Sequence, residues 1–216
     1  MAHTAAITGP FVRVTRQEEL VNFAQVLAGA FSNDRLSRYL YLGRESRPDH
    51  PKNSQHDERV RYWLPAVQSR FEKDSLLLQS FDWAAVALWI PPGIEKPNPS
   101  ATATEGAFEY KTKVDQCKKK HLGNSLHWNL NLVGRMPDRT DKGAIRALIS
   151  PILEKARQDG LPAWLEATNE HARAVYTHLG FKEVDRFRIG EGVINSEGWA
   201  QENGEGVLIY AMIAGL

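Results

Sequence analysis

The chain has 216 residues, of which 42% are hydrophobic and 25% are charged, and its formal net charge is +1. This composition is typical of a globular protein in water, and we expect a single domain over residues 1–216. A net charge near zero provides no general field for nucleic acid or an anionic membrane, so we expect neither as a partner. The one cysteine, Cys117, excludes an internal disulfide and fits a reducing, cytoplasmic location.

Neither the N-terminal residues nor the longest apolar run suggests a targeting or membrane-spanning segment. The first residues, MAHTAAITGPFVRVTRQ, lack both a charged start and a long apolar run, so no signal peptide is expected. The longest apolar run, WAAVALWIPPG, is much shorter than the roughly 20 residues of a membrane-spanning helix.

The first half of the chain alternates between apolar periodic segments and loops rich in Pro, Gly and Ser. Pro65 lies inside one predicted helix and is expected to kink or split it. We predict strands over 11–15, 76–80 and 82–90, helices over 17–30, 57–73 and 107–120, and loops over 43–56 and 94–106. The charged face of the lysine-rich helix is expected to lie in solvent.

The second half is more regular and predicts strands and helices in alternation. Strands are expected over 125–136, 163–168, 181–190 and 206–213, and helices over 143–158 and 169–180. Strict alternation in the first of these strands places His127, Asn129, Asn131 and Val133 on one face. A polar face on a central strand indicates either a wet cleft or an exposed edge.

The segment 161–184, LPAWLEATNEHARAVYTHLGFKEV, resembles the acyl-CoA-binding half of the GNAT acyltransferase superfamily, and is especially similar to fungal-type members. Residues 126–156, AAVALWIPPG and GVLIYAMI resemble the other strands and the pyrophosphate helix of that family. The resemblance implies an α/β fold with a mixed, mostly antiparallel central sheet, splayed central strands and helices on both faces.

The resemblance also implies acyl-CoA, most simply acetyl-CoA, as co-substrate in the opening between the fourth and fifth strands. The thioester carbonyl would meet strand amides at Val133, Gly134 and Arg135. The pyrophosphate would lie on the loop TDKGAI at the start of the next helix, where free N–H groups and the helix dipole favour anions. The residues implied at this end are Arg139, Thr140, Lys142, Gly143, Ala144 and Arg146.

This loop departs from the family pattern Gln/Arg-x-x-Gly-x-Gly/Ala. Only Gly143 matches a defining position, whereas Thr140 and Ile145 replace residues of other kinds. Asp141 adds a negative charge that Arg139, Lys142 and Arg146 could offset. Retained, altered and lost CoA binding all remain open on this pattern.

Tyr176 matches the family tyrosine that protonates the departing CoA thiolate, although its helical spacing also fits a core position. Glu166 and His127 are the candidates for a general base acting on the amine. Asn169 fits a helix N-cap and a contact to the CoA arm, and Arg173 could meet a phosphate or lie in solvent.

The acceptor pocket is expected, by family analogy, near the N-terminal helical region. Its candidate residues, each of which also fits the core, are Asp34, Arg38, Tyr39, Trp83 and Trp128. No metal site is expected, because the chain contains neither Cys-x-x-Cys nor His-x-x-x-His.

The resemblance thus implies a GNAT-type N-acyltransferase that acts on a small-molecule amine by direct attack, as a monomer or homodimer. Two alternatives stay open. One is a protein of this fold that has lost CoA use and catalyses elimination, cyclisation or isomerisation of a small molecule. The other is a ligand-binding domain without catalysis.

Overall fold

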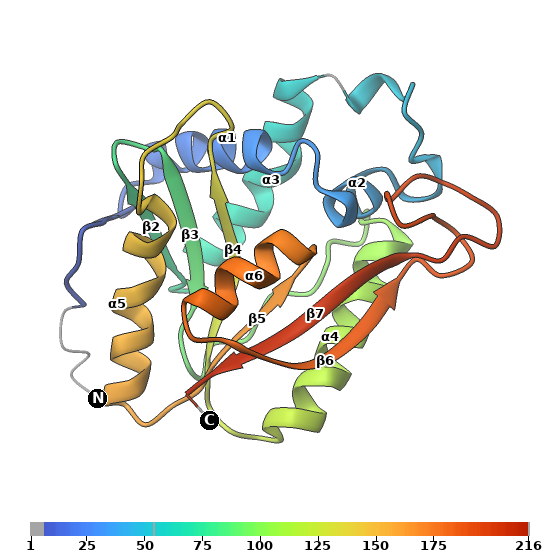
Figure 1. The fold of residues 1–216 in the computed structure, drawn as a ribbon. Helices are drawn as coiled ribbons and strands as arrows, with labels where there is room; N and C mark the ends of the chain where they lie inside the picture. The colour runs from blue at the N-terminus through green and yellow to red at the C-terminus, as the bar shows by residue number, and fades with distance from the viewer. Residues whose placement is uncertain (1–6, 54, 216) are drawn as a thin grey trace.

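The computed structural model describes residues 7–53 and 55–215. Within these residues, one mixed sheet lies between helices on both of its faces (Figure 1). The strands are β1 (Val12–Arg13), β2 (Leu76–Ser80), β3 (Ala85–Ile90), β4 (Trp128–Arg135), β5 (Ala163–Ala167), β6 (Lys182–Ile189) and β7 (Val207–Ala214). The α-helices are α1 (Leu20–Ala30), α2 (Arg35–Leu42), α3 (His56–Phe71), α4 (Glu105–Leu122), α5 (Ala144–Gln158) and α6 (Glu170–His178). Three short 3-10 helices are η1 (Gln17–Glu19), η2 (Gly43–Glu45) and η3 (Pro51–Asn53).

The strand order is β1-β2-β3-β4-β5-β7-β6. Every neighbouring pair is antiparallel except β4 and β5, which run parallel. The single parallel pair lies in the middle of the sheet, and α5 is the crossover that connects its two strands, as a parallel connection requires. The predicted mixed, mostly antiparallel sheet is therefore confirmed.

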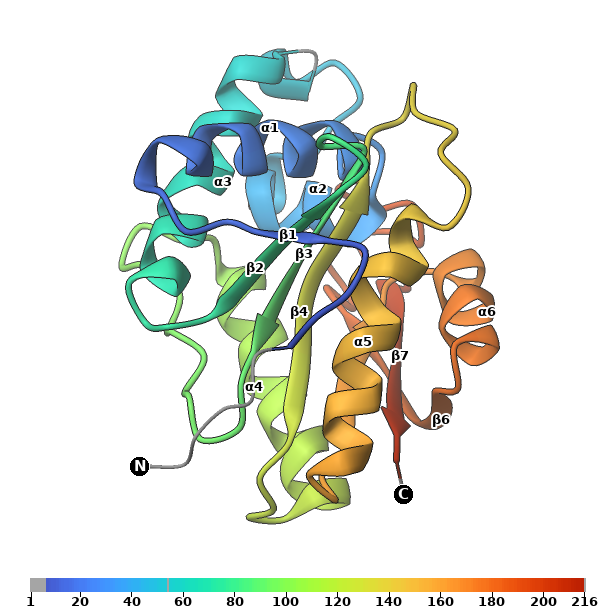
Figure 2. The same ribbon diagram turned by 90° about the vertical axis from the view of Figure 1, so that its left-hand side faces the viewer.

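Two apolar layers hold the helices against the sheet (Figure 2). On one face, Leu148, Ile149 and Ile152 of α5 pack with Trp89 and Leu165 of the strands. The opposite face carries a second cluster formed by α1, α3 and the alternate residues of β2 and β3. Farther along that second face, α4 covers β5 and β7 through contacts that include Cys117 and Trp164.

The strands β4 and β5 separate soon after they meet. Their ladder contains two residue pairs, Trp128 with Ala163 and Asn129 with Trp164. Beyond these pairs the two strands diverge toward their carboxyl ends (Figure 1). The sheet is therefore open at its centre over most of the length of β4.

A β-bulge interrupts β4 at Asn131. Leu88 pairs with Leu132, whereas the next residue, Trp89, pairs with Leu130, so Asn131 is the extra residue. A bulge reverses the side-chain alternation that follows it and bends the strand. Leu132 therefore packs with the α1–α3 layer and Val133 with the α5 layer. The prediction of strict alternation from 126 to 133 is wrong for this reason.

Other differences from the sequence prediction are local. Helix α2 is separate from α1, whereas its residues were expected to continue the first helical region, and the segment expected to be a loop over 43–56 contains η2 and η3. Pro65 lies inside α3 without splitting it, since the helix continues to Phe71, and Val67 beyond the proline is buried in the core. No helix in the described residues is long and apolar enough to span a membrane. The first six residues of the expected signal-free N-terminus lie outside the described residues.

Candidate active site

A large cavity opens where β4 and β5 separate, with a volume of about 1660 Å³. Its walls come from both faces of the sheet. On one face they include the start of α5 and most of α6, and on the other they include α2, α3, the loop over 94–104 and α4. The opening therefore connects the two faces through the centre of the sheet.

The N-terminus of α5 lines this cavity and has no side-chain cap. Gly143 occupies the N-cap position with φ of 84°, in the left-handed region that favours glycine. A Cβ built on Gly143 would meet nothing within 4 Å, so the space above this backbone is open. Ala144, Ile145 and Arg146 continue the lining. Because the first N–H groups of a helix have no partner within it, this end can bind an anion.

Asp141 does not present a free negative charge to this helix end. Its carboxylate forms an ion pair of 2.8 Å with Nε of Arg139. The same guanidinium donates hydrogen bonds to the carbonyls of Phe81 and Asp82 in the β2–β3 turn. Arg139 lowers the pKa of Asp141, and the pair keeps the loop over 137–143 attached to the sheet. The expectation that Arg139 could offset Asp141 is confirmed.

The edge of β4 that faces β5 is free beyond the bulge. The amide of Met136 donates to Ala84 beside β3, and backbone groups alternate along a strand. The amides of Val133 and Arg135 therefore point toward the cavity, which both residues line. Gly134 faces α1, where an added Cβ would lie 2.6 Å from Cβ of Ala30. Close helix packing thus explains this glycine.

Tyr176 lies on α6 and lines the cavity from the α5 side. Its ring packs edge-on against Phe181 with the ring centroids 6.1 Å apart. Loss of hydration, together with the charge of Asp34, raises the pKa of the Tyr176 phenol. The phenol is therefore a proton donor at neutral pH, and both predicted features, core packing and cavity access, occur together.

Glu166 lies on β5 and faces the opposite side of the opening. The hydroxyl of Tyr110 on α4 donates to Oε2 of Glu166 at 3.0 Å, and the indole N–H of Trp164 donates to Oε1. Two donors thus fix the carboxylate at the cavity wall. Burial and the Glu166 charge raise the pKa of Tyr110, which keeps this phenol in its donor form.

Asp34 and Asn169 are the other predicted residues that line the cavity. Asp34 caps α2 by accepting from the amide of Ser37 at 2.7 Å, and its other oxygen accepts from Thr168. Loss of hydration raises the pKa of Asp34. Asn169 caps α6 by accepting from the amide of Ala172 at 2.8 Å, as its N-cap interpretation predicts. A contact from Asn169 to CoA stays a prediction.

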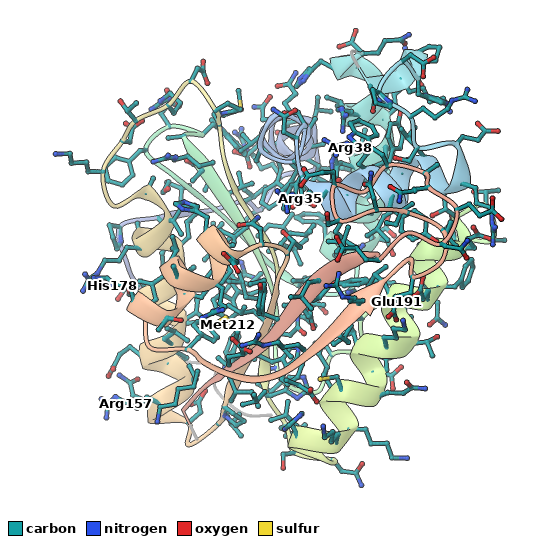
Figure 3. The ribbon with its side chains drawn as sticks, turned by 45° about the vertical axis from the view of Figure 1, so that its right-hand side comes forward. Arg35, Arg38, Arg157, His178, Glu191 and Met212 are labelled. Atoms are coloured by element: carbon teal, nitrogen blue, oxygen red, sulfur yellow. The ribbon has the colours of Figure 1, made fainter. Side chains whose placement is uncertain are left out.

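Several predicted acceptor residues lie elsewhere in the fold. Tyr39 is buried between α4 and the strands β6 and β7. Arg38 lies on α2 (Figure 3), and its guanidinium stacks on Trp199 in the loop before β7. Trp83 lies in the β2–β3 turn against the α1–α3 layer. Trp128 packs edge-on against Trp89 in the α5 layer. None of these four lines the cavity, because each side chain packs elsewhere in the fold.

Predicted site residues near the cavity mouth also differ in position. Arg139, Thr140 and Lys142 belong to the loop before α5 but do not line the cavity. Arg173 turns toward β6, where it pairs with Glu183 at 3.3 Å. His127 precedes β4 at the closed end of the opening, and its ring contacts the carbonyl of Ser125. Its position leaves Glu166 as the predicted base that lines the cavity.

Tyr110, Lys96 and Arg70 line the cavity and were not among the site residues predicted from the sequence. Tyr110 stands four residues from both Gly106 and Val114, which are buried on the inner face of α4. That spacing could have identified it. Arg70 lies near the end of α3 and Lys96 in a proline-rich loop, and neither position carries a sequence signal that distinguishes it from a solvent-exposed residue.

A group of possible metal ligands lies outside the cavity. Cys117, His121 and Asp185 have ligand atoms within 4.8 Å of one another. One oxygen of Asp185 already accepts from Lys120 at 2.7 Å and contacts His121 at 2.8 Å. The ammonium of Lys120 therefore competes with a cation at this position, and the expected absence of a metal stays a prediction.

The chain was compared with known proteins. No family model matches it. An uncharacterized N-acetyltransferase of Schizosaccharomyces pombe is 30% identical over 124 residues, which are 49% of this chain and 50% of that protein. The chain thus spans about half the length of this curated relative.

Solved structures match almost the whole chain. The C-terminal condensation domain of Ebony, in complex with β-alanyl-dopamine, matches with a TM-score of 0.65 at 12% identity, over 95% of this chain and 99% of that chain. The polyamine N-acetyltransferase of Drosophila melanogaster, which catalyses the formation of N-acetylagmatine, matches with a TM-score of 0.61 at 11% identity, over 95% and 100%. The chain has the fold of the GNAT N-acetyltransferases, as its sequence resemblance implies.

Proposed function

We propose that the protein transfers an acyl group, most simply acetyl, from acyl-CoA to the nitrogen of a small-molecule amine. One observation carries this proposal. The gap between β4 and β5 joins an uncapped helix N-terminus on one face of the sheet to a fixed carboxylate, Glu166, on the other. An anionic thioester donor and an amine can therefore approach each other from opposite faces.

The residues at the α5 end fit the donor. The open space above Gly143, the first-turn amides of Ile145 and Arg146 and the exposed Arg146 side chain suit a pyrophosphate. Asp141, the acidic residue of this loop that lines the cavity, is paired with Arg139. The amides of Val133 and Arg135 would hold the thioester carbonyl oxygen. Acyl-CoA supplies the acyl group as a thioester.

Glu166 is the proposed general base. Its carboxylate accepts the proton that the ammonium or attacking amine must lose, directly or through a water molecule. Tyr110 and Trp164 hold the carboxylate in one orientation by donating to both of its oxygens. This position supports Glu166 over His127, which does not line the cavity.

Tyr176 is the proposed general acid. As the amine nitrogen bonds to the carbonyl carbon, the carbon–sulfur bond breaks and the electron pair leaves with sulfur. The phenol of Tyr176 gives its proton to the resulting thiolate. The raised pKa of Tyr176 keeps that proton in place until the thiolate forms. Among the described residues its hydroxyl donates to no protein group, so it is free for this role.

The proposal is tested by titrating the protein with acetyl-CoA in a calorimeter and then measuring CoA thiol release with a panel of primary amines. Saturable heat and amine-dependent thiol release are expected. Absence of heat at millimolar acetyl-CoA would reject the proposal and favour the alternative in which a protein of this fold has lost CoA use. Binding of acetyl-CoA without release for any amine would favour a binding domain without catalysis.

A further inference from the structure

The acceptor side of the cavity holds two cations that form no ion pair within the described residues. Lys96 and Arg70 both line this part, and Lys118 lies behind it against the ring of Trp164. Two carboxylates line the same side, Glu166 and Asp34, and Asp34 already accepts hydrogen bonds from Ser37 and Thr168. The other cavity cations on this side, Arg61 and Lys111, are paired with Glu58 and Asp115 respectively.

Lys96 has no carboxylate partner among the described residues. Its ammonium lies 5.1 Å from the centroid of the Tyr110 ring. Loss of hydration lowers the pKa of Lys96 to about 8, although the Glu166 charge acts in the opposite direction. A cation that has lost water without gaining an anion is destabilised, and a ligand anion would restore the missing interaction.

Arg70 is held so that part of its guanidinium remains available. Nε donates to Oδ1 of Asn131 at 2.7 Å, and Nη1 donates to the carbonyl of Ala66 at 2.7 Å. Nη2 donates to no group within the described part of the chain. Asn131 is the bulge residue of β4, so the side chain of the bulge holds Arg70 at the cavity wall.

We propose that Lys96 and Arg70 bind a carboxylate of the acceptor, and that the acceptor is therefore an amine that carries a carboxylate in the same molecule. Both cations lie near Tyr110, which hydrogen-bonds Glu166. The acceptor amine reaches Glu166 while its carboxylate contacts the two cations. This inference rests on the proposed acyl transfer and specifies the acceptor for it.

Matched pairs of acceptors test this inference, because each pair differs only by the carboxylate. Suitable pairs are tyrosine and tyramine, arginine and agmatine, and ornithine and putrescine. Transfer from acetyl-CoA and calorimetric binding are measured for both members. The carboxylated member of at least one pair is expected to bind and react at a concentration about 10-fold lower than its decarboxylated partner.

Variants assign the preference to the two cations. Lys96→Met is expected to abolish the preference for the carboxylated acceptor, and Lys96→Arg is expected to retain it. Arg70→Gln is likewise expected to abolish this preference, and Arg70→Lys to retain it. Lys182→Met, which removes an exposed charge at the start of β6, serves as the control. Thermal unfolding shows whether each variant is folded.

The outcomes separate this inference from the proposed function. Equal or weaker binding of every carboxylated member, or a preference that survives Lys96→Met and Arg70→Gln, overturns the inference even if acetyl transfer occurs. Absence of acetyl-CoA binding rejects the proposed function alone when a carboxylated amine still binds in a Lys96-dependent way. If no carboxylated amine gives heat, the inference fails.

Discussion

The hydroxyl of Tyr110 lies 3.0 Å from Oε2 of Glu166 and donates to it across the gap between α4 and β5. This contact links α4, which lines one side of the acceptor space, to β5, the strand that carries the proposed base. Trp164, two residues before Glu166 on the same strand face, donates to the other oxygen. The carboxylate therefore has a fixed orientation before any amine arrives.

Replacement of Glu166 by Gln tests its role as base. Gln keeps the size of the side chain and can still accept from Tyr110, but it cannot take a proton. We expect kcat/KM for amines to fall about 100-fold, within the usual range for loss of a general base. Acetyl-CoA affinity, measured by calorimetry, should remain unchanged.

The matched control for Glu166 is Glu170→Gln, at the start of α6 and outside the cavity lining. It should retain activity. A Glu166→Gln protein with normal kcat/KM would show that another group removes the proton. Asp34, which lines the cavity and has a raised pKa, would then be the next residue to replace.

Tyr176→Phe tests the proposed acid. Removal of the phenolic hydroxyl should lower kcat about 100-fold or more while the protein still binds acetyl-CoA, because the ring and its packing against Phe181 remain. Tyr210→Phe is the control, since it removes a buried hydroxyl that does not line the cavity. Equal rates for the wild type and Tyr176→Phe would contradict the assignment.

Arg146 is predicted to contact the donor phosphates at the start of α5. Arg146→Gln should weaken acetyl-CoA binding about 5- to 10-fold, and the loss should shrink as salt is added. Binding of S-acetylpantetheine, which has no diphosphate, should not change. Arg157→Gln, at the other end of the same helix (Figure 3), should leave acetyl-CoA binding as it is. An equal loss with both ligands would place Arg146 outside the phosphate site.

The charge state of Lys96 predicts a pH dependence. Because its pKa is lowered to about 8, Lys96 is mostly charged at pH 7 and mostly neutral at pH 9. Affinity for a carboxylated acceptor, relative to its decarboxylated partner, should therefore fall as pH rises through about 8. The charged groups that act on Lys96 are Glu166 and Asp115, which raise its pKa, and Lys118 and Arg70, which lower it.

Lys96→Arg is the control for this titration, because a guanidinium stays charged throughout the range. In that variant the relative affinity should change little between pH 7 and pH 9. An identical fall in Lys96→Arg and the wild type would mean that another group causes it.

A larger residue at Gly134 is predicted to lower the stability of the fold rather than the rate of the reaction. A Cβ at this position would lie 2.6 Å from Cβ of Ala30, so Gly134→Ala should lower the free energy of unfolding by about 1–3 kcal/mol. Denaturant unfolding measures the change. Adding Ala30→Gly should recover part of the loss, because the second substitution removes the atom that clashes. Additive losses in the double variant would contradict the proposed clash.

Much of the fold could be predicted because the hydrophobic periods of strands and helices are local. Residues 144–158 show a helical apolar face, and the same residues pack on the sheet. The bulge at Asn131 could not be predicted, since it depends on how β3 and β4 pair rather than on either sequence alone. Its consequence, the reversed orientation of Leu132 and Val133, was therefore missed.

Part of the site could be predicted from the order of residues along the chain. Gly143, Glu166 and Tyr176 were proposed because the resemblance assigns positions along the chain, and all three line the cavity. Tyr39 and Trp128 could not be separated from pocket residues, because aromatic side chains serve in both environments. Lys96 and Arg70 come from a loop and a helix end that only the folded chain brings to one wall.

The ladder between β4 and β5 has two residue pairs, so few backbone hydrogen bonds join the two halves of the sheet. A molecule that binds between the halves β1–β4 and β5–β7–β6 therefore adds contacts to both and stabilises their association. Binding to the native state alone adds RT ln(1 + [L]/Kd), about 2.7 kcal/mol at a ligand concentration 100 times Kd. The melting temperature should therefore rise with the concentration of acyl-CoA. Thermal unfolding would then measure acyl-CoA binding even in a variant that does not catalyse transfer.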